Sequence, residues 1–356
     1  MSLNRKQKRT LKKAAFQTVF YILITGLVVA ILTPVYFIVT LSFLSTREAY
    51  KYPLPMTPAL KMSFELKEGK RGYLISVWDR VDEEYQSILD TTDLEKIRVY
   101  FDAQLGISVT PDEIQQYIDA FKATGQPVYF TMRRNLLSNY ETFFSVTRDA
   151  VPALIRSLEI ALITIVISLT IGGMAGYAFA RYLFKGRDAL KFSVLFVRMF
   201  PGVAIAIPMV IILANMGLYD QPLGLALIYS VGAIGLTVWI TASIFLGIPI
   251  SLEEAAMVFG ATKLQAFIRI TLPLAFPGLA AAAMYTFLGA WNETVAAIIL
   301  TQFHPTFSVV VYQTLLGATG QINLAAAGGI AMAIPAVFFT FILRKYINQM
   351  WGGMTV

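Results

Sequence analysis

The chain has 356 residues, of which 56% are hydrophobic and only 14% are charged, and it carries no cysteine and a single histidine. Its mean hydropathy of +0.63 lies outside the range of soluble globular domains. The composition predicts a membrane protein with several spans. The lack of cysteine excludes disulfides, thiolate nucleophiles and cysteine-ligated metals.

The N-terminal segment, residues 1–15, carries six basic residues and no acidic one. A large part of the formal net charge of +7 therefore lies beside the first apolar run, residues 16–44, and does not indicate a nucleic-acid-binding surface. This run is much longer than the roughly 7–15 residue core of a signal peptide, and no small-residue cleavage pattern follows it. We expect a basic cytoplasmic tail followed by a retained signal-anchor helix.

Residues 45–150 have the composition of a small water-soluble domain of mixed α+β type. The segment 62–78, MSFELKEGKRGYLISVW, predicts two strands around a glycine-containing turn, and PVYFTMRR at 127–134 predicts a further strand. Acidic residues slightly outnumber basic ones in this domain, so the charge pattern favours no nucleic-acid partner.

Two amphipathic helices are expected between these strands. Thr92 and Glu95 have the spacing of a capping box for the first helix. Thr110 is the expected N-cap of the second, and Gly125 is its expected stop.

Five further segments are apolar and long enough to cross a hydrocarbon core, which needs about 20 helical residues. Together with 16–44 they predict six spans, the others being 153–183, 189–216, 222–247, 273–300 and 325–347. We therefore expect an all-α polytopic membrane protein with an α+β insertion between its first and second spans.

Loop charge predicts the direction of these spans, because positively charged loops remain cytoplasmic. The outer loops 217–221 and 301–324 contain no Lys or Arg, whereas the basic residues gather in the alternate loops. This places the N-terminus and the C-terminal tail 348–356 in the cytoplasm, and the insertion 45–150 outside.

The loop between the fourth and fifth spans, residues 248–272, is polar and contains helix-capping signals. Gly260 can adopt the positive φ that ends a helix. Two Ser/Thr-x-x-Glu/Gln boxes predict two short helices at different angles: Ser251 with Glu254, and Thr262 with Gln265. A small apolar stripe on the first helix suits a shallow groove on another protein: Leu252, Ala255, Ala256 and Phe259.

From physics alone, three interpretations of this loop stay open. It can be a docking element for a partner protein, a connector lying on the membrane surface, or a DNA-binding helix-turn-helix, for which it has too few basic residues. Enzymatic chemistry has little support, because the chain lacks a G-x-x-x-x-G-K-[ST] phosphate loop and a His-Glu-x-x-His motif. The only histidine, His304, is expected to be a loop residue beside Pro305.

The segment EEAAMVFGATKLQAFIRITLPLAFPGL resembles the EAA signature of permease subunits in binding-protein-dependent ABC importers. The matching positions are Glu254, Ala255, Ala256, Gly260, Ile270, Leu272 and Pro273. AGYAFARYLFKGRD, MFPG, GIPISLEEAA and FLGAWNETVAAIIL are similar to the carbohydrate-uptake branch, above all to the MalG-type permeases of maltose and maltodextrin importers. The resemblance covers roughly residues 130–350. The family usually has Asp where this chain has Phe259.

The resemblance implies the six-helix type I permease fold and a heteromeric importer. Its partners would be a homologous second permease, a dimer of ATPase subunits that bind the ATP, and an extracytoplasmic sugar-binding protein. This chain itself would be no enzyme and would need no cofactor. By this resemblance the residues that couple to the ATPase are Glu253, Glu254, Ala255, Ala256, Phe259, Gly260 and Ala261.

Polar and aromatic residues near the outer end of the fifth span are candidates for the translocation pathway, because polar groups at that depth need a partner or a water-filled cavity. They are Tyr285, Trp291, Asn292 and Glu293. The partner permease could hold the sugar instead. In the third span, Arg198 is expected to snorkel to the cytoplasmic surface rather than to line the pathway. Pro201, Pro208 and the glycines within 172–176 are expected to permit kinks and close helix approach.

Two other classes of function remain open, a membrane-tethered sensor that uses the outer domain and a membrane enzyme. A sensor would be stable alone with no ATPase attached. An enzyme would turn over without nucleotide.

The predicted topology can be tested by cysteine labelling, since the chain has no native Cys. A single Cys at Asp119 should react with a membrane-impermeant maleimide on intact cells, and one at Lys263 only after permeabilisation. The reverse pattern would contradict the orientation.

Overall fold

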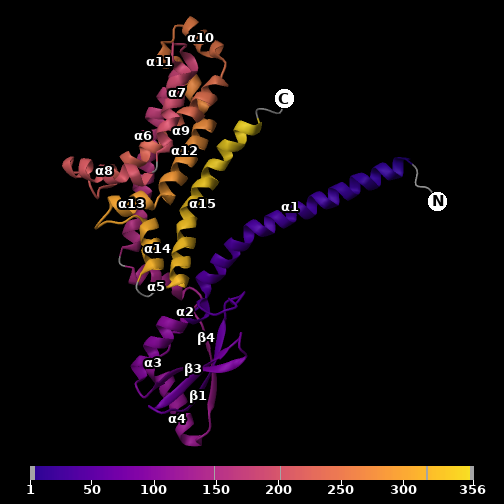
Figure 1. Cartoon of the computed structure of the whole chain (residues 1–356), viewed down its shortest axis with the longest axis vertical. Helices are drawn as coiled ribbons and strands as arrows, with labels where there is room; N and C mark the ends of the chain where they lie inside the picture. The colour runs from indigo at the N-terminus through magenta and orange to yellow at the C-terminus, as the bar shows by residue number, and fades with distance from the viewer. Residues whose placement is uncertain (1–4, 148, 201, 318–319, 353–356) are drawn as a thin grey trace. The chain divides into compact units, whose positions relative to one another are not determined.

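The structure is a computed structural model that describes residues 5–147, 149–200, 202–317 and 320–352. It divides into two compact units, unit 1 (Met1–Phe143 and Thr319–Ile330) and unit 2 (Phe144–Ala318 and Ala331–Val356). Figure 1 labels the elements of both units.

Unit 1 contains one long helix and a small α+β domain. Its elements are α1 (Arg5–Phe43), α2 (Thr46–Ala49), β1 (Lys61–Glu68), β2 (Tyr73–Asp79), β3 (Glu84–Thr91), α3 (Leu94–Tyr100), the π-helical turn η1 (Phe101–Leu105), α4 (Pro111–Thr124) and β4 (Val128–Arg133). Two helices, α5 (Ser138–Val146) and α15 (Ile322–Gly352), have residues in both units.

The four strands form an antiparallel sheet in the order β3-β2-β1-β4. Phe64 of β1 lies opposite Val77 of β2 and Phe130 of β4. The sheet packs against α3 and α4 through one apolar core, in which Phe64 stacks on Phe101 at 4.8 Å between ring centres. The predicted strands β1, β2 and β4 are confirmed, whereas β3 was missed because its sequence, EYQSILDT, lacks a clear apolar alternation.

The helix caps of this domain confirm one prediction and correct another. Thr110 and Glu113 form the capping box of α4, and Gly125 ends that helix with a φ of 64°. The Thr92–Glu95 box is wrong by one residue: Asp93 is the N-cap of α3 and accepts the backbone N–H groups of Glu95 and Lys96.

Unit 2 is entirely helical in its described part. Its elements are α6 (Ala150–Arg181), α7 (Arg187–Phe196), the 3-10 turn η2 (Val197–Met199), α8 (Gly202–Asn215), α9 (Pro222–Leu246), α10 (Ile250–Val258), α11 (Lys263–Ala266), the π-helical turn η3 (Phe267–Thr271), α12 (Leu272–Asn292), α13 (Val295–Leu300) and α14 (Phe307–Leu316).

The described helices confirm the all-helical membrane fold and refine the spans. Five are long and apolar enough to cross a membrane: Phe16–Phe43, Ala150–Arg181, Pro222–Leu246, Lys263–Asn292 and Ile322–Tyr346. The predicted third span is a pair of helices, Arg187–Met199 and Gly202–Asn215, bent by 86°; counted as one, it gives six. Pro201, where we expected a kink, lies outside the described residues, as do the last four residues of the tail, 353–356.

The predicted fifth span, 273–300, is wrong at both ends. The helical path begins at Lys263 and continues through the π-helical turn η3 into α12. Pro273 lies in the first turn of α12, and the wider turn before it accommodates the proline ring and its missing N–H. At the other end Asn292 closes α12, and Glu293 is extended, with its Oε1 accepting the N–H of Ala296 at 3.0 Å to start α13. The residues on both sides of this break are apolar, so the hydropathy pattern of the sequence does not reveal it.

Helices α6 and α9 approach closely because glycines of α6 face threonines of α9. The hydroxyl of Thr241 donates to the carbonyl oxygen of Gly172 at 3.1 Å. A Cβ on Gly176 would overlap the Thr241 hydroxyl and lie 2.9 Å from the Ala242 nitrogen, whereas one on Gly173 would meet nothing within 4 Å. The expected close approach is thus confirmed at Gly172 and Gly176.

A methyl group added at Gly176 should force these helices apart. Gly176→Ala is expected to destabilise unit 2 by about 1–3 kcal/mol, the usual effect of overpacking. Gly173→Ala is the matched control and should be neutral. Thermal unfolding of the purified variants in detergent measures the difference, and equal midpoints would contradict the packing described here.

Candidate coupling helix and membrane cavity

Helix α10 and the turn after it form a compact polar element at one end of unit 2, next to α11 (Figure 1). Gly260 ends this helix with a φ of 92°, and Thr262 and Gln265 form the expected capping box that starts α11. The predicted Ser251–Glu254 box is wrong: α10 begins at Ile250, two residues earlier than this box predicts, with Pro249 at the N-cap position and no side-chain cap.

One face of this element is exposed and largely apolar. Phe259 is 91% and Val258 is 83% exposed, and Leu252, Glu254 and Ala255 are also exposed. Ala256 is only partly exposed. Apolar side chains gathered in this way indicate a surface that another protein covers.

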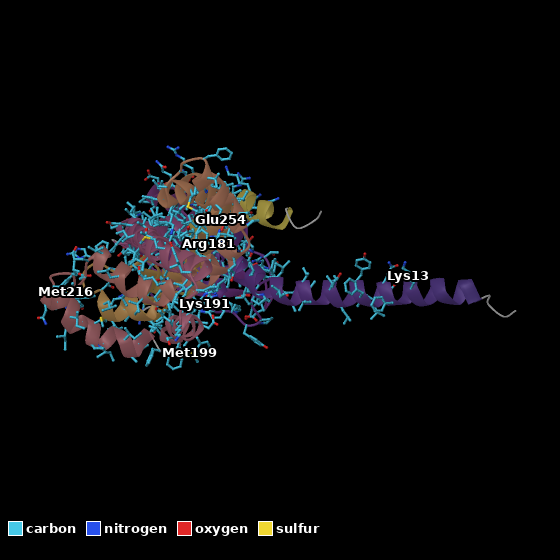
Figure 2. All side chains as sticks on the ribbon, turned by 90° about the horizontal axis from the view of Figure 1, so that it is seen from above. Lys13, Arg181, Lys191, Met199, Met216 and Glu254 are labelled. Atoms are coloured by element: carbon cyan, nitrogen blue, oxygen red, sulfur yellow. The ribbon has the colours of Figure 1, made fainter. Side chains whose placement is uncertain are left out.

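Glu253 lies on the opposite face and is buried, with 6% of its surface exposed. Its carboxylate accepts a hydrogen bond from the Tyr177 hydroxyl at 2.6 Å and forms an ion pair with Arg181 Nε at 2.7 Å. The Arg181 guanidinium also donates to the carbonyl oxygen of Phe245, the second-last residue of α9, at 2.8 Å. This cluster therefore ties α10 to the ends of both α6 and α9. Figure 2 labels Arg181 and Glu254, the neighbour of Glu253.

Burial by itself would raise the pKa of Glu253, but the hydrogen bonds from Tyr177 and Arg181 outweigh it and hold the pKa below its ordinary value. The carboxylate is thus ionised at neutral pH. Sequence reasoning grouped Glu253 with the docking residues. The structure shows instead that Glu253 is a buried partner of Tyr177 and Arg181. These two residues are four positions apart and share one face at the end of a span, and this spacing was the signal in the sequence.

A cavity of about 200 Å³ lies among the membrane helices of unit 2. Its polar lining comes from α6, η2, α9 and α12 and from the break after α12: Thr164, Arg198, Tyr229, Tyr285, Thr286 and Glu293. Arg198 donates to the Tyr285 hydroxyl, and its guanidinium carbon lies 5.2 Å from the centre of that ring. Arg198 therefore lines the cavity, and its expected snorkelling to the cytoplasmic surface stays a prediction.

The predicted pathway residues fall into two groups. Tyr285 and Glu293 line the cavity, whereas Asn292 is exposed and is not part of its wall. Trp291 is a core residue with 2% exposure, because it stacks on Phe287 and its Nε1 donates to the carbonyl oxygen of Met332 at 2.9 Å.

The loop between α13 and α14 is anchored by polar groups from distant helices. The Asp220 carboxylate accepts the backbone N–H groups of Gln302 and Phe303 and contacts His304 Nδ1 at 2.9 Å. Burial opposes ionisation of Asp220, yet these bonds hold its pKa below the ordinary value. Ser157 of α6 fixes the start of α14 by accepting the Phe307 N–H at 2.8 Å. His304 is thus a loop residue held by a carboxylate.

No cluster of three or more His, Asp or Glu side chains in the described part of the chain could hold a metal ion. The geometry instead provides a helix with an exposed apolar face, clamped to the spans, and a cavity between those spans.

Residues 168–351, more than half of the chain, match the family described as the binding-protein-dependent transport system inner membrane component. The chain belongs to this family. As a permease component it is a transport protein and not an enzyme.

Sequence relatives agree with this family, and a solved structure shares the fold. The trehalose transport system permease protein SugB of Mycobacterium tuberculosis is 38% identical over 199 residues, which are 55% of this chain and 73% of that protein. The trehalose/maltose permease MalG of Thermococcus litoralis is 30% identical over 218 residues, or 60% and 78% of the two chains. A chain of a bacterial ABC transporter that imports the polysaccharide alginate superposes with a TM-score of 0.57 at 17% identity, covering 98% of this permease and 99% of its own length. At that identity the likeness shows the fold alone.

Removal of the Glu253 carboxylate should leave Arg181 buried without its ion-pair partner. Glu253→Ala is expected to destabilise the permease by about 3 kcal/mol or more, the usual effect of breaking a buried ion pair. Glu254→Ala, at an exposed neighbouring position, is the matched control and should change stability little. Thermal unfolding in detergent compares the two, and an equally small effect of both would contradict the clamp.

Proposed function

We propose that this chain is the membrane permease of an ATP-driven importer of sugars, and that its substrates are maltose- or maltodextrin-type oligosaccharides. In this proposal it forms half of the translocation pathway. The relatives named for trehalose and maltose transport support the substrate class. The observation that carries the coupling role is the Glu253–Arg181 pair, which clamps an exposed docking helix to the spans.

The same geometry explains how a docked ATPase would move the spans. A force on the exposed face of α10 reaches α6 and α9 through the cluster of Glu253, Arg181 and Tyr177. It reaches α12 through α11 and η3, because these form one helical path from Lys263 to Asn292. A disordered loop would absorb the motion, whereas this capped element transmits it. Glu254, Ala255, Ala256, Phe259, Gly260 and Ala261 are the proposed contacts or turn residues at the ATPase.

The cavity between the spans is the proposed path of the solute. The Tyr285 ring offers an apolar face to a sugar, and Arg198 and Glu293 offer hydrogen bonds to its hydroxyls. Asn292, exposed at the end of α12, is proposed to extend this path towards the neighbouring subunit. Trp291 supports the wall from behind by fixing α12 to α15.

The proposed assembly contains a homologous second permease, two ATPase subunits that bind the ATP, and an extracytoplasmic sugar-binding protein. The anchored loop and α14 are the proposed contact for the binding protein. Both chain termini are proposed to be cytoplasmic in a prokaryotic inner membrane, and we propose no cofactor and no nucleic-acid partner for the chain itself. The comparisons give no support to a membrane-tethered sensor.

The coupling role is tested by changing the turn and the docking face separately. Gly260→Val places a β-branched residue at a φ of 92°, which should redirect α11 and abolish sugar uptake in vesicles that hold the complete importer. Phe259→Ala removes an exposed side chain, so it should reduce the amount of co-purified ATPase without lowering thermal stability.

Phe303→Ala is the control for Phe259→Ala, because Phe303 is an exposed aromatic residue in the loop anchored by Asp220. It should leave the co-purified ATPase unchanged. The coupling role would be contradicted if Gly260→Val took up sugar at the wild-type rate and Phe259→Ala co-purified with a normal amount of ATPase. The loop would then be only a connector between two spans.

A further inference from the structure

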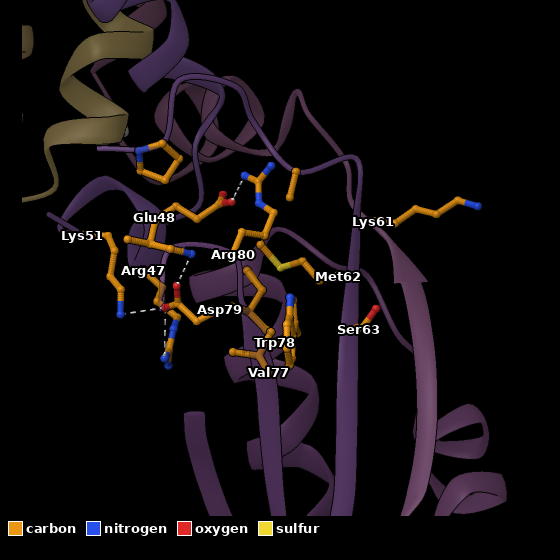
Figure 3. Close-up of a pocket in the computed structure, with 14 residues that line it drawn as sticks. Arg47, Glu48, Lys51, Lys61, Met62, Ser63, Val77, Trp78, Asp79 and Arg80 are labelled. Carbon is orange, nitrogen blue, oxygen red and sulfur yellow. Dashed lines mark hydrogen bonds and ion pairs between the residues drawn. The ribbon is translucent and has the colours of Figure 1, made fainter. Parts of the chain in front are cut away.

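A second cavity, of about 290 Å³, lies in the α+β domain of unit 1. One side of the cavity is formed by α2 and the loop that follows it, and the other side by residues of β1 and β2 (Figure 3). The family match begins at residue 168, so this domain lies outside it and nothing in the family description assigns the cavity a role.

Two carboxylates of the cavity wall, Asp79 and Glu48, are each shared by two cations. Lys51 binds Asp79 at 2.7 Å and Arg47 lies 4.0 Å from the same carboxylate, whereas Arg80 binds Glu48 at 2.6 Å. Arg134, whose side chain is fully buried, also contacts Glu48, at 3.3 Å. These ion pairs hold the carboxylates and the cationic groups in place, so the wall offers both hydrogen-bond donors and acceptors.

These contacts disfavour an anionic ligand, because it would compete with Asp79 and Glu48 for cations that they already bind. The remaining lining cation, Lys61, has no ion pair or hydrogen bond among the described residues, but Figure 3 shows it pointing away from the paired groups. A neutral ligand rich in hydroxyl groups can use both members of each pair, since each hydroxyl donates one hydrogen bond and accepts others.

Trp78 provides an apolar surface beside these polar groups. It is 40% exposed although it belongs to a strand, and it is held by an edge-on contact with Tyr85 at 5.1 Å between ring centres. A fixed indole face next to charged hydrogen-bonding groups matches the two surfaces of a pyranose ring, which is apolar over its C–H face and polar around its rim.

The cavity size limits the ligand to a small one. Ligand pockets are typically about 300–1,000 Å³, and this cavity of about 290 Å³ lies just below that range. It fits one sugar residue or the end of a longer chain.

We propose that this cavity binds a terminal residue of a neutral saccharide, with Trp78 stacking on the ring and the Arg80–Glu48 and Lys51–Asp79 pairs binding its hydroxyls. The site is additional to the cavity between the membrane spans. It goes beyond the proposed function, because it concerns binding by a domain that the family does not include and does not require transport.

The full-length chain in lipid nanodiscs is the material for the test, since maltoside detergents themselves carry a sugar. Saturation-transfer difference NMR with maltotriose should detect binding to the wild type and to Tyr285→Ala, in which the membrane cavity has lost its aromatic face. In the Tyr285→Ala background Trp78→Ala should weaken binding by about two- to tenfold, the loss expected for one stacking contact. Sodium glucuronate, as an acidic probe, should bind more weakly than maltotriose.

Two further variants separate recognition from folding. Trp78→Tyr keeps an aromatic face and should retain most of the affinity. Tyr129→Ala is the matched control, because Tyr129 is an exposed aromatic residue of the same sheet that does not line the cavity, and it should bind as the wild type does.

Equal maltotriose binding by Trp78→Ala and the wild type would overturn the proposal, as would loss of binding by Tyr129→Ala alone or tighter binding of glucuronate. These failures are distinct from failure of the proposed function. That function is measured as ATP-dependent uptake by the assembled importer, whereas this assay uses the lone chain without nucleotide.

Discussion

The buried contact of Glu253 with Arg181 and Tyr177 is the interaction on which the docking end of unit 2 depends. A carboxylate removed from water is tolerated only when it is paired and hydrogen-bonded, so its partners determine where α10 can lie. Because Arg181 also binds the carbonyl oxygen of Phe245, the orientation of α10 is tied to two spans at once. Its exposed face, with Val258 and Phe259, is then presented in one fixed direction.

The helices that α10 is tied to are themselves held by small residues. Gly172 and Gly176 let α6 approach the threonines of α9 so closely that the hydroxyl of Thr241 reaches the backbone of α6. Such contacts replace the hydrophobic effect, which does not drive helices together in lipid. Polar residues between the helices line a cavity. Asp220 and Ser157 anchor the loop between α13 and α14 through its backbone N–H groups.

The α+β domain is stabilised by different interactions from those between the membrane helices. It has its own apolar core around Phe64 and Phe101 and pairs its buried charges locally, so it has the organisation of a water-soluble domain. Its cavity and the cavity between the spans share one chemistry, an aromatic face beside paired or hydrogen-bonded charged groups. One chain therefore offers two places where a polyhydroxylated solute could be held.

The sequence by itself determined the membrane class, the approximate positions of most spans, the α+β insertion and the short helices of the loop 248–272, because long apolar runs, strand alternation and helix caps are local patterns. Gly260 and the Thr262 box were predictable for this reason. The Ser251 box failed because α10 begins at Ile250, two residues before the helix start that this box predicts.

Tertiary structure alone decided which polar residues meet. Glu253 and Arg181 are 72 positions apart, and Arg198 and Tyr285 are 87 positions apart. No local pattern connects such pairs. Trp291 and Tyr285 are both aromatic residues of one helix, yet α15 buries the first and the cavity exposes the second. Burial and pairing are properties of the packed helices, and for that reason the roles of these residues appeared only once the helices were in place.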